Sequence, residues 1–415
     1  MPCGLADMAL EFHCRSCGGL AGALVLDLGV QPLANNYLNP GDLFQTEPKF
    51  PLRLAVCHGC GLLQILDLVP PTQLFCQYAY FSSCSDTWVR HAESCASRYL
   101  GEFGLGPRSR VVEVASNDGY LLRHFVAAGV PCLGIEPAAN IARVAEAAGV
   151  PTRVAFFGAT LARELAVEGG LADLILGNNV FAHCPDPNDF VAGLQALLAP
   201  EGRVVLEFPH ALEMLSQGEF DTIYHEHVFY FTLTAVEPLF RRHGLRITRV
   251  ERTPLHGGSL RVFARHITHE ADATVEALMA EEARVGVVSA PRLADFAARA
   301  ASTRDQLRSR LAAIRAAGYH IAAYGAAAKG STLLNYCGLG RETLDFVADR
   351  SPHKHGRLMP GSHVPIVPAV ELARRRPDYT LLLAWNFAPE ILEQQKDYRA
   401  AGGRFIIPVP EVAIV

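Results

Sequence analysis

The densest group of titratable side chains in the sequence occupies four consecutive positions, Tyr224, His225, Glu226 and His227. They follow a predicted strand at 204–208 and precede an apolar run at 228–231. Such a group can supply a general base, a partner that orients it and a phenolic hydrogen-bond donor. In an extended segment residues 224 and 226 would share one side and residues 225 and 227 the other, whereas a turn would pair them differently. A metal-binding His-x-His pair and a solvated polar loop are the alternatives.

A second segment predicts a cofactor site. Residues 111–122 predict a strand, a tight turn and a helix, and residues 131–135 predict a second strand that is followed by Glu136. In a doubly wound fold the crevice beyond the strand ends binds adenosine ligands, and a carboxylate there can accept hydrogen bonds from both ribose hydroxyls. The turn has one glycine where the dinucleotide fingerprint has three around a pyrophosphate. A ligand without phosphates is therefore favoured.

S-adenosylmethionine (SAM) is a common ligand of this kind, and its cationic sulfonium and ammonium groups suit the carboxylates of the turn. An ordinary βαβ unit with solvated acidic side chains is the alternative. The residues expected to contact SAM lie in the turn and at the tips of neighbouring strands: Glu113, Ser116, Asn117, Asp118, Gly119, Glu136 and Asn178.

Two Cys-x-x-Cys pairs predict a metal site. Cys14 and Cys17 form the first pair and Cys57 and Cys60 the second, each followed by a glycine. Short turns of this kind aim two sulfurs at one point, so two of them can close a tetrahedral site around zinc. Four thiolates leave no open position for water, which predicts a structural zinc. Buried thiols with coincidental spacing are the alternative.

Two further segments are expected to face the same crevice. Asn179 and His183 follow the predicted strand at 172–176, where cofactor and substrate meet in an open α/β sheet. The alternatives are a helix cap by Asn179 and a buried His183. Tyr78 lies in a segment rich in aromatic and hydroxyl residues that could cover a substrate as a lid, with aromatic core packing as the alternative.

The turn at 325–332 combines small residues with Lys329 and Ser331 at a predicted helix N-terminus. Backbone N–H groups, the helix dipole and the ammonium could together bind a phosphate. A small-residue turn that permits close helix packing is the alternative. Asp349, after the next predicted strand, and Lys354 could add contacts to a ribose or a diphosphate.

The elements that position these residues predict an α/β protein of several domains, because at 415 residues a single core is improbable. Parallel strands are expected near 110–115, 131–135, 173–177, 203–208 and 260–265, and a long helix or helix pair at 270–317. Strands near 320–324, 344–349 and 379–385 predict a second, smaller α/β domain. The predicted parts are a zinc-binding module (1–75), a central Rossmann-like domain (76–268), a helical connector (269–318) and a C-terminal α/β domain (319–415).

Composition narrows the classes of partner. The net charge is −5, and no basic run interleaved with aromatics predicts a nucleic-acid face. No apolar run approaches the roughly 20 residues needed to span a bilayer, and no signal sequence is evident. We therefore expect a cytoplasmic protein with reduced thiols that acts on a small molecule, without nucleic acid or membrane; a monomer is compatible with the sequence, which does not fix the oligomeric state.

The sequence resembles the nucleotide-sugar C-methyltransferases that make branched deoxysugars. Five motifs carry this resemblance in the same order: the four cysteines, the turn from Glu113 to Gly119, residues 179–183, residues 224–227 and residues 325–330. The resemblance covers almost the entire chain. It implies an N-terminal zinc-binding module, a central class I SAM-dependent methyltransferase domain and a C-terminal domain that helps to hold the nucleotide. The implied substrate is a dTDP-linked 4-keto-deoxysugar.

The resemblance also implies roles for single residues. His227 would be the base, Tyr224 and Glu226 would assist at the sugar with His225 on the substrate side, Asn179 and His183 would line the pocket, and Tyr78 would close it. These roles are chemically consistent, because a C–H next to a ketone can be removed when the enolate oxygen is stabilised. The carbon would then attack the sulfonium methyl without a metal. O- or N-methyl transfer and a non-catalytic binding scaffold are the alternatives.

Overall fold

A computed structural model describes residues 12–75, 81–84, 86–254 and 257–415. The central part is a seven-stranded sheet in the order β10-β11-β8-β7-β4-β5-β6. Its parallel strands are β4 (Val111–Val114), β5 (Cys132–Ile135), β6 (Thr152–Arg153), β7 (Ala172–Asn178) and β8 (Leu198–Pro209). The expectation of a purely parallel sheet was wrong. The strand β11 (Ser259–His266) runs antiparallel to β8, and β10 (Leu245–Thr253), which was not anticipated, pairs antiparallel with β11.

Helices cover both faces of this sheet because its strands are apolar on both sides. Val111 belongs to the apolar cluster that contains Tyr99 of α2 (Asp86–Glu102) and Phe125 of α3 (Leu122–Ala127). Its neighbour Val112 points to the other face and joins the cluster that contains Phe190 of α6. The remaining helices of this part are α4 (Ala139–Ala147), α5 (Ala159–Gly169), α6 (Pro187–Leu197), α7 (Ala211–Gln217) and α8 (Leu233–Arg242).

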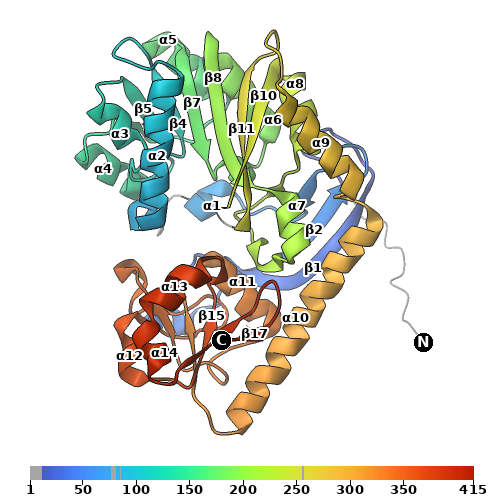
Figure 1. Cartoon of the computed structure of the whole chain (residues 1–415), viewed down its shortest axis with the longest axis vertical. Coiled ribbons are helices and arrows are strands. Elements are labelled where there is room, and N and C mark those ends of the chain that lie inside the picture. Colours follow the sequence, from blue (N-terminus) through green and yellow to red (C-terminus); the bar gives the residue numbers. More distant parts are fainter. Residues whose placement is uncertain (1–11, 76–80, 85, 255–256) are drawn as a thin grey trace.

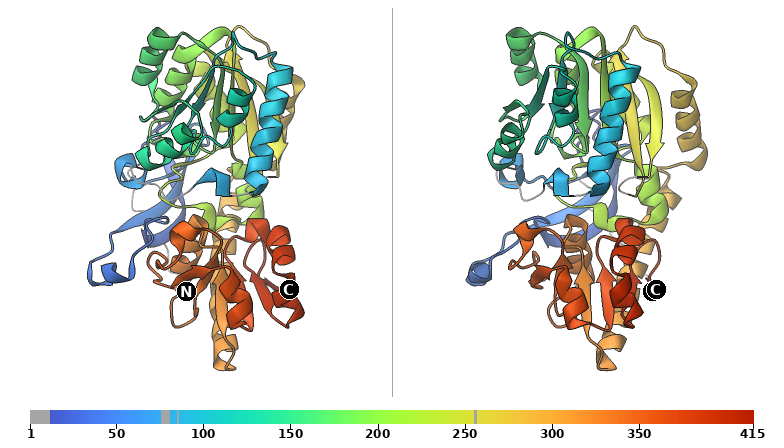
Figure 2. Two further views of the ribbon diagram at one scale, coloured as in Figure 1. Left: turned by 90° about the vertical axis from the view of Figure 1, so that its left-hand side faces the viewer. Right: turned by 60° about the vertical axis from the view of Figure 1, so that its left-hand side comes forward.

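The N-terminal part is a four-stranded antiparallel sheet in the order β1-β2-β3-β9. The long hairpin of β1 (Gly22–Pro32) and β2 (Lys49–Cys57) carries the short helix η1 (Pro40–Phe44) at its outer end (Figure 2). After β3 (Leu63–Ile65), the sheet is completed by β9 (Phe229–Tyr230), a strand that immediately follows the 224–228 segment. The short helices α1 (Pro71–Phe75) and η2 (Ser82–Cys84) follow β3. The N-terminal sheet therefore reaches the segment that carries the titratable cluster.

The predicted helix pair is confirmed: α9 (Ala273–Val285) and the long α10 (Ala290–Ala316) lead from the central part to the C-terminal one (Figure 1). There a six-stranded sheet has the order β14-β13-β12-β15-β16-β17, with only β17 antiparallel. Its strands are β12 (Ile321–Tyr324), β13 (Val347–Asp349), β14 (Ile366–Pro368), β15 (Tyr379–Leu382), β16 (Arg404–Ile407) and β17 (Ala413–Ile414). The helices are α11 (Ala328–Cys337), α12 (Val370–Arg375), α13 (Ala388–Gln394) and α14 (Lys396–Ala400).

Three of these strands, β12, β13 and β15, lie where the sequence predicted them. Across the described ranges, no helix combines the length and the apolar character needed to cross a bilayer. Figure 1 shows the C-terminal part below the carboxyl ends of the central strands, with β1 beside it. Contacts of β1 with α10 and α11 join the N-terminal sheet to the connecting helices and to the C-terminal part.

Candidate active site

The four cysteines of the two Cys-x-x-Cys pairs converge as predicted. All four sulfur atoms, from Cys14, Cys17, Cys57 and Cys60, lie within 4.8 Å of one another. In each knuckle the amide of the following glycine, Gly18 or Gly61, donates to the carbonyl of the first cysteine at 2.9 Å, and both glycines adopt positive φ. These turns hold the sulfurs at the spacing of a tetrahedral four-thiolate zinc site.

The 224–227 segment forms a turn, and the turn brings Tyr224 and His227 together. The phenolic Oη of Tyr224 lies 2.7 Å from Nε2 of His227, and the backbone amide of His227 donates to the Tyr224 carbonyl at 2.9 Å. An extended segment would instead have placed Tyr224 beside Glu226. The other ring nitrogen, Nδ1, lies 3.0 Å from the carbonyl oxygen of Thr222.

The Thr222 carbonyl fixes the tautomer of His227. A carbonyl oxygen can only accept a hydrogen bond, so Nδ1 of His227 carries the hydrogen. The Nε2 atom of the neutral ring then has its lone pair directed at the Tyr224 hydroxyl, which donates to it. An imidazole held in this tautomer can act as a general base through Nε2.

The two histidines of the cluster do not share a ligand. Nε2 of His225 lies 3.1 Å from the carbonyl of Pro51, and its ring packs edge-on against Phe50, both in β2. Burial lowers the pKa of His225. The structure thus places His225 against the N-terminal sheet, while His227 faces Tyr224, so this pair does not form a metal site.

His183 lies next to His227. The two ring centroids are 4.8 Å apart and the rings meet edge to face. Burial lowers the pKa of His183 to about 4, so its imidazole is neutral near pH 7. Asn179 adopts a left-handed backbone (φ 53°), and the following short helix η3 (Phe181–His183) has Val180 as its N-cap. Asn179 is therefore not the helix cap that the alternative required.

Glu226 is buried and points toward a segment that sequence reasoning missed. Its Oε1 accepts a hydrogen bond from the side-chain amide of Asn35 at 2.8 Å. Two residues further on, the buried Tyr37 donates to the carbonyl of Ala326 at 2.7 Å, and Lys354 donates to the same oxygen at 2.7 Å. The pattern of apolar and amide residues at 33–37, directly after a strand, was the available signal. These contacts join the three parts of the chain beside the 224–227 turn.

The C-terminal turn is built differently from a phosphate-binding loop with free donors. Asp349 accepts a hydrogen bond from the amide of Ala326 at 2.6 Å, and Ser331 is buried within α11. The ammonium of Lys329 lies 4.3 Å from the ring centroid of Trp385. A Cβ added to Gly325 would lie 2.7 Å from Cβ of Ala384, so this glycine permits close packing.

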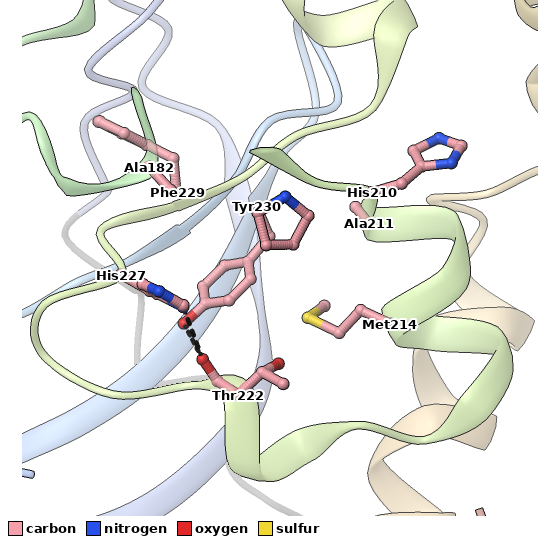
Figure 3. Close-up of a pocket in the computed structure, with 9 residues that line it drawn as sticks. Ala182, His210, Ala211, Met214, Thr222, His227, Phe229 and Tyr230 are labelled. Atoms are coloured by element: carbon pink, nitrogen blue, oxygen red, sulfur yellow. Dashed lines mark hydrogen bonds between the residues drawn. The ribbon is translucent and has the colours of Figure 1, made fainter. Parts of the chain in front are cut away.

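A small pocket lies behind His227 (Figure 3). His227 and Tyr230 line one side, and His210 and Met214 line the other. Tyr230 donates a hydrogen bond to the Thr222 carbonyl at 3.3 Å, and Nε2 of His210 lies 2.7 Å from Glu282 of α9. The sequence did not single out Tyr230, His210 or Met214, because their positions beside His227 arise from contacts between distant segments.

Three segments match known protein families. Residues 14–75 match a zinc binding domain, residues 88–250 a methyltransferase domain, and residues 254–410 the C-methyltransferase C-terminal domain. Over 405 residues the chain is 39% identical to the C-methyltransferase NovU of Streptomyces niveus, and the alignment covers 97% of this chain and 96% of that protein. The chain belongs to the SAM-dependent C-methyltransferases. The predicted family, zinc module and SAM cofactor are confirmed.

Solved structures of other methyltransferases resemble part of this C-methyltransferase. Magnesium protoporphyrin IX methyltransferase (ChlM) of Synechocystis PCC 6803 with bound SAM is 15% identical, with a TM-score of 0.33, and covers 42% of this chain and 78% of its own. A SAM-dependent methyltransferase of Mesorhizobium loti is 19% identical, with a TM-score of 0.34, and covers 42% and 98%. Each of these two structures aligns with less than half of the residues of the C-methyltransferase.

The acidic turn of the C-methyltransferase fits a cationic cofactor. Glu113 is fully buried, and burial together with the carboxylates of Asp118 and Glu136 raises its pKa well above the usual range. Oδ1 of Asp118 and Oγ of Ser116 are buried and have no hydrogen-bond partner among the described residues. A ligand that brings positive charge and donors would satisfy these groups.

Several predicted SAM contacts also have partners within the protein. Glu136 accepts hydrogen bonds from the amides of Asn117 (3.1 Å) and Ala138 (2.8 Å), and burial raises its pKa. The side chains of Asn117 and Asp118 accept hydrogen bonds from the amides of Ser82 and Ser83. Gly119 has φ +74°, and a Cβ there would lie 2.9 Å from Val150.

Asn178 lies at the end of β7, the strand whose carboxyl end faces the crevice, and is half-buried. Tyr78 lies outside the described residues. The turn and strand tips thus hold Asn117, Asp118, Glu136 and Asn178 in the region expected to bind SAM.

Proposed function

We propose that this C-methyltransferase methylates a carbon next to the ketone of a nucleotide-linked 4-keto-deoxysugar of the dTDP type, with His227 as the base. The observation that carries this proposal is the tautomer of His227. Its Nδ1–H donates to Thr222, and its Nε2 carries the lone pair, which accepts a hydrogen bond from the Tyr224 hydroxyl. A base of this kind is needed for carbon methylation, because the carbon nucleophile must first lose a proton.

SAM, when bound in the acidic turn, supplies an electrophilic methyl group. His227 Nε2 removes the proton from the carbon beside the ketone, and the electron pair of that C–H bond moves toward the ketone oxygen. Nε2 accepts a hydrogen bond from Tyr224, so a substrate that reaches this nitrogen displaces the hydroxyl. The displaced phenol can then donate to the enolate oxygen, the atom where charge develops.

In this proposal Glu226 binds the sugar and the C-terminal part binds the nucleotide. Glu226 is a buried residue of the 224–227 turn, and its carboxylate can accept hydrogen bonds from sugar hydroxyls. Its Oε1 already accepts one hydrogen bond, from the side-chain amide of Asn35. From Asn35, the segment leads through Tyr37 to Ala326 and Lys354. A ligand with its sugar at Glu226 and its nucleotide near residues 326, 349 and 354 would follow this path.

The test uses a panel of ketosugar nucleotides with isotopically labelled SAM. We expect a methyl group on a carbon next to the ketone, located by NMR, and incorporation of solvent deuterium at the same carbon when SAM is absent. Methylation at oxygen or nitrogen without deuterium incorporation would contradict the proposal. It would instead favour O- or N-methyl transfer.

A further inference from the structure

The carbonyl that fixes the His227 tautomer belongs to a short segment between α7 and the catalytic turn. This segment includes the helix η4 (Phe220–Thr222). The Thr222 carbonyl accepts a hydrogen bond from Nδ1 of His227 at 3.0 Å. It also accepts one from the Tyr230 hydroxyl at 3.3 Å (Figure 3). If this carbonyl turned away, Nδ1 would lose its acceptor, and the ring could adopt the other tautomer.

The C-terminal part holds this segment on both sides of Thr222. On one side, the indole Nε1–H of Trp385 donates to Oδ2 of Asp221 at 2.7 Å, a bond in which both side chains are buried. On the other side, the hydroxyl of Thr332 in α11 donates to the carbonyl of Ile223 at 3.1 Å. Residue 222 thus lies between two residues that are each tied to the C-terminal part.

The ammonium of Lys329 offsets the negative charge of the Asp221 carboxylate that accepts from Trp385. Its ammonium lies 4.3 Å from the Trp385 ring centroid, and it interacts electrostatically with Asp221 and Glu219. Burial raises the pKa of Asp221 to about 6, an effect that Lys329 opposes. A buried carboxylate with a nearby cation and an indole donor is a strong acceptor, so the bond to Trp385 should resist rearrangement.

We propose that Trp385 and Thr332 are positioning residues, through which the C-terminal part holds the Thr222 carbonyl and thereby the reactive tautomer of His227. This inference rests on the proposed role of His227 as the base. It gives the C-terminal part a function in proton abstraction in addition to any contact with the nucleotide. It also gives Lys329 a structural partner, Asp221, in place of a phosphate.

The experiment compares Trp385→Phe and Thr332→Val with Thr332→Ser, which keeps the hydroxyl. Nitrogen chemical shifts of 15N-histidine-labelled protein report the tautomer of His227, whose signal is assigned by its loss in His227→Gln. Exchange of the substrate proton in deuterated water without SAM reports the deprotonation step. We expect the two donor-deleting variants to show a mixture of tautomers and exchange slowed about five- to tenfold, the effect of one net hydrogen bond.

In these variants KM for the ketosugar nucleotide and the affinity for SAM should stay within about threefold of wild type, and Thr332→Ser should restore wild-type exchange. Tyr398→Phe is the matched control, because it removes a buried hydrogen bond to Thr380 within the C-terminal part alone. An unchanged tautomer in both variants, or unchanged exchange, would overturn the positioning role. If wild-type protein shows the Nδ1–H tautomer but exchanges no proton with any ketosugar nucleotide, the proposed function fails while the structural contact stands.

Discussion

The side-chain amide of Asn35 donates a 2.8 Å hydrogen bond to Glu226, a residue 191 positions later in the chain. The bond orients the carboxylate that we propose for the sugar. Asn35→Ala should therefore lower kcat/KM for the ketosugar nucleotide about tenfold, mainly through KM, while the affinity for SAM is unchanged. Steady-state kinetics and calorimetry measure the two effects. Asn36→Ala, at the exposed neighbouring position, is the control and should behave as wild type.

Replacing the proposed base should remove methyl transfer and leave cofactor binding intact. In His227→Ala no group takes the place of Nε2, so we expect loss of both methyl transfer and substrate deuterium exchange, with SAM affinity within a few-fold of wild type. Tyr224→Phe keeps the base but removes the hydroxyl 2.7 Å from it. It should retain measurable exchange with kcat reduced about 100-fold, the usual effect of removing one oxyanion donor. Full activity of His227→Ala would exclude His227 from the mechanism.

Zinc removal should unfold the N-terminal part and disturb the catalytic turn with it. The four-cysteine cluster anchors a sheet in which β3 pairs with β9, the strand that follows His227. We expect Cys17→Ser to lower the zinc content, the thermal midpoint and the activity together, because metal binding is coupled to folding. Metal analysis, thermal melts and activity assays on the same samples check this. Cys132→Ser, at a half-buried thiol in β5 outside the cluster, should keep its zinc and its activity.

The parts of the site that the sequence could predict are those whose information is local. Each zinc knuckle is defined by two cysteines and a glycine within five residues, and their sulfurs do converge. The end of β7 likewise leads to His183, whose ring contacts that of His227 in the 224–227 turn, because loops after parallel strands meet at one edge of the sheet. The strand β10 was not predicted because charged residues interrupt its apolar pattern. Two of them, Arg249 and Glu251, form ion pairs with Glu102 and Arg98 of α2.

The rest of the site depends on contacts between distant segments. Trp385 reaches Asp221 across 164 residues and Thr332 reaches Ile223 across 109, and neither pairing has a local signal. The pairing of Tyr224 with His227 required a turn, which the four polar residues alone did not specify. Spacing could therefore indicate which residues carry the chemistry, but the tautomer of His227 followed only from the folded chain.

The buried carboxyl of Glu219 should make stability fall as pH rises. Only 3% of this residue is exposed, and burial raises the pKa of its carboxyl from 4.5 to about 7, with Lys329 opposing the shift. Between these values the folded state holds more protons than the unfolded state, so stability is fully present below about pH 4.5 and is lost as pH rises through 7. The raised pKa of Asp221 acts in the same direction.

Glu219→Gln cannot ionise, and it should therefore recover up to about 3 kcal/mol of unfolding free energy at pH 8 and little at pH 5. Denaturant titrations at the two pH values measure this, with the exposed Glu164→Gln as a control expected to change neither. An equal effect of Glu219→Gln at both pH values would show that the carboxyl does not titrate in this range.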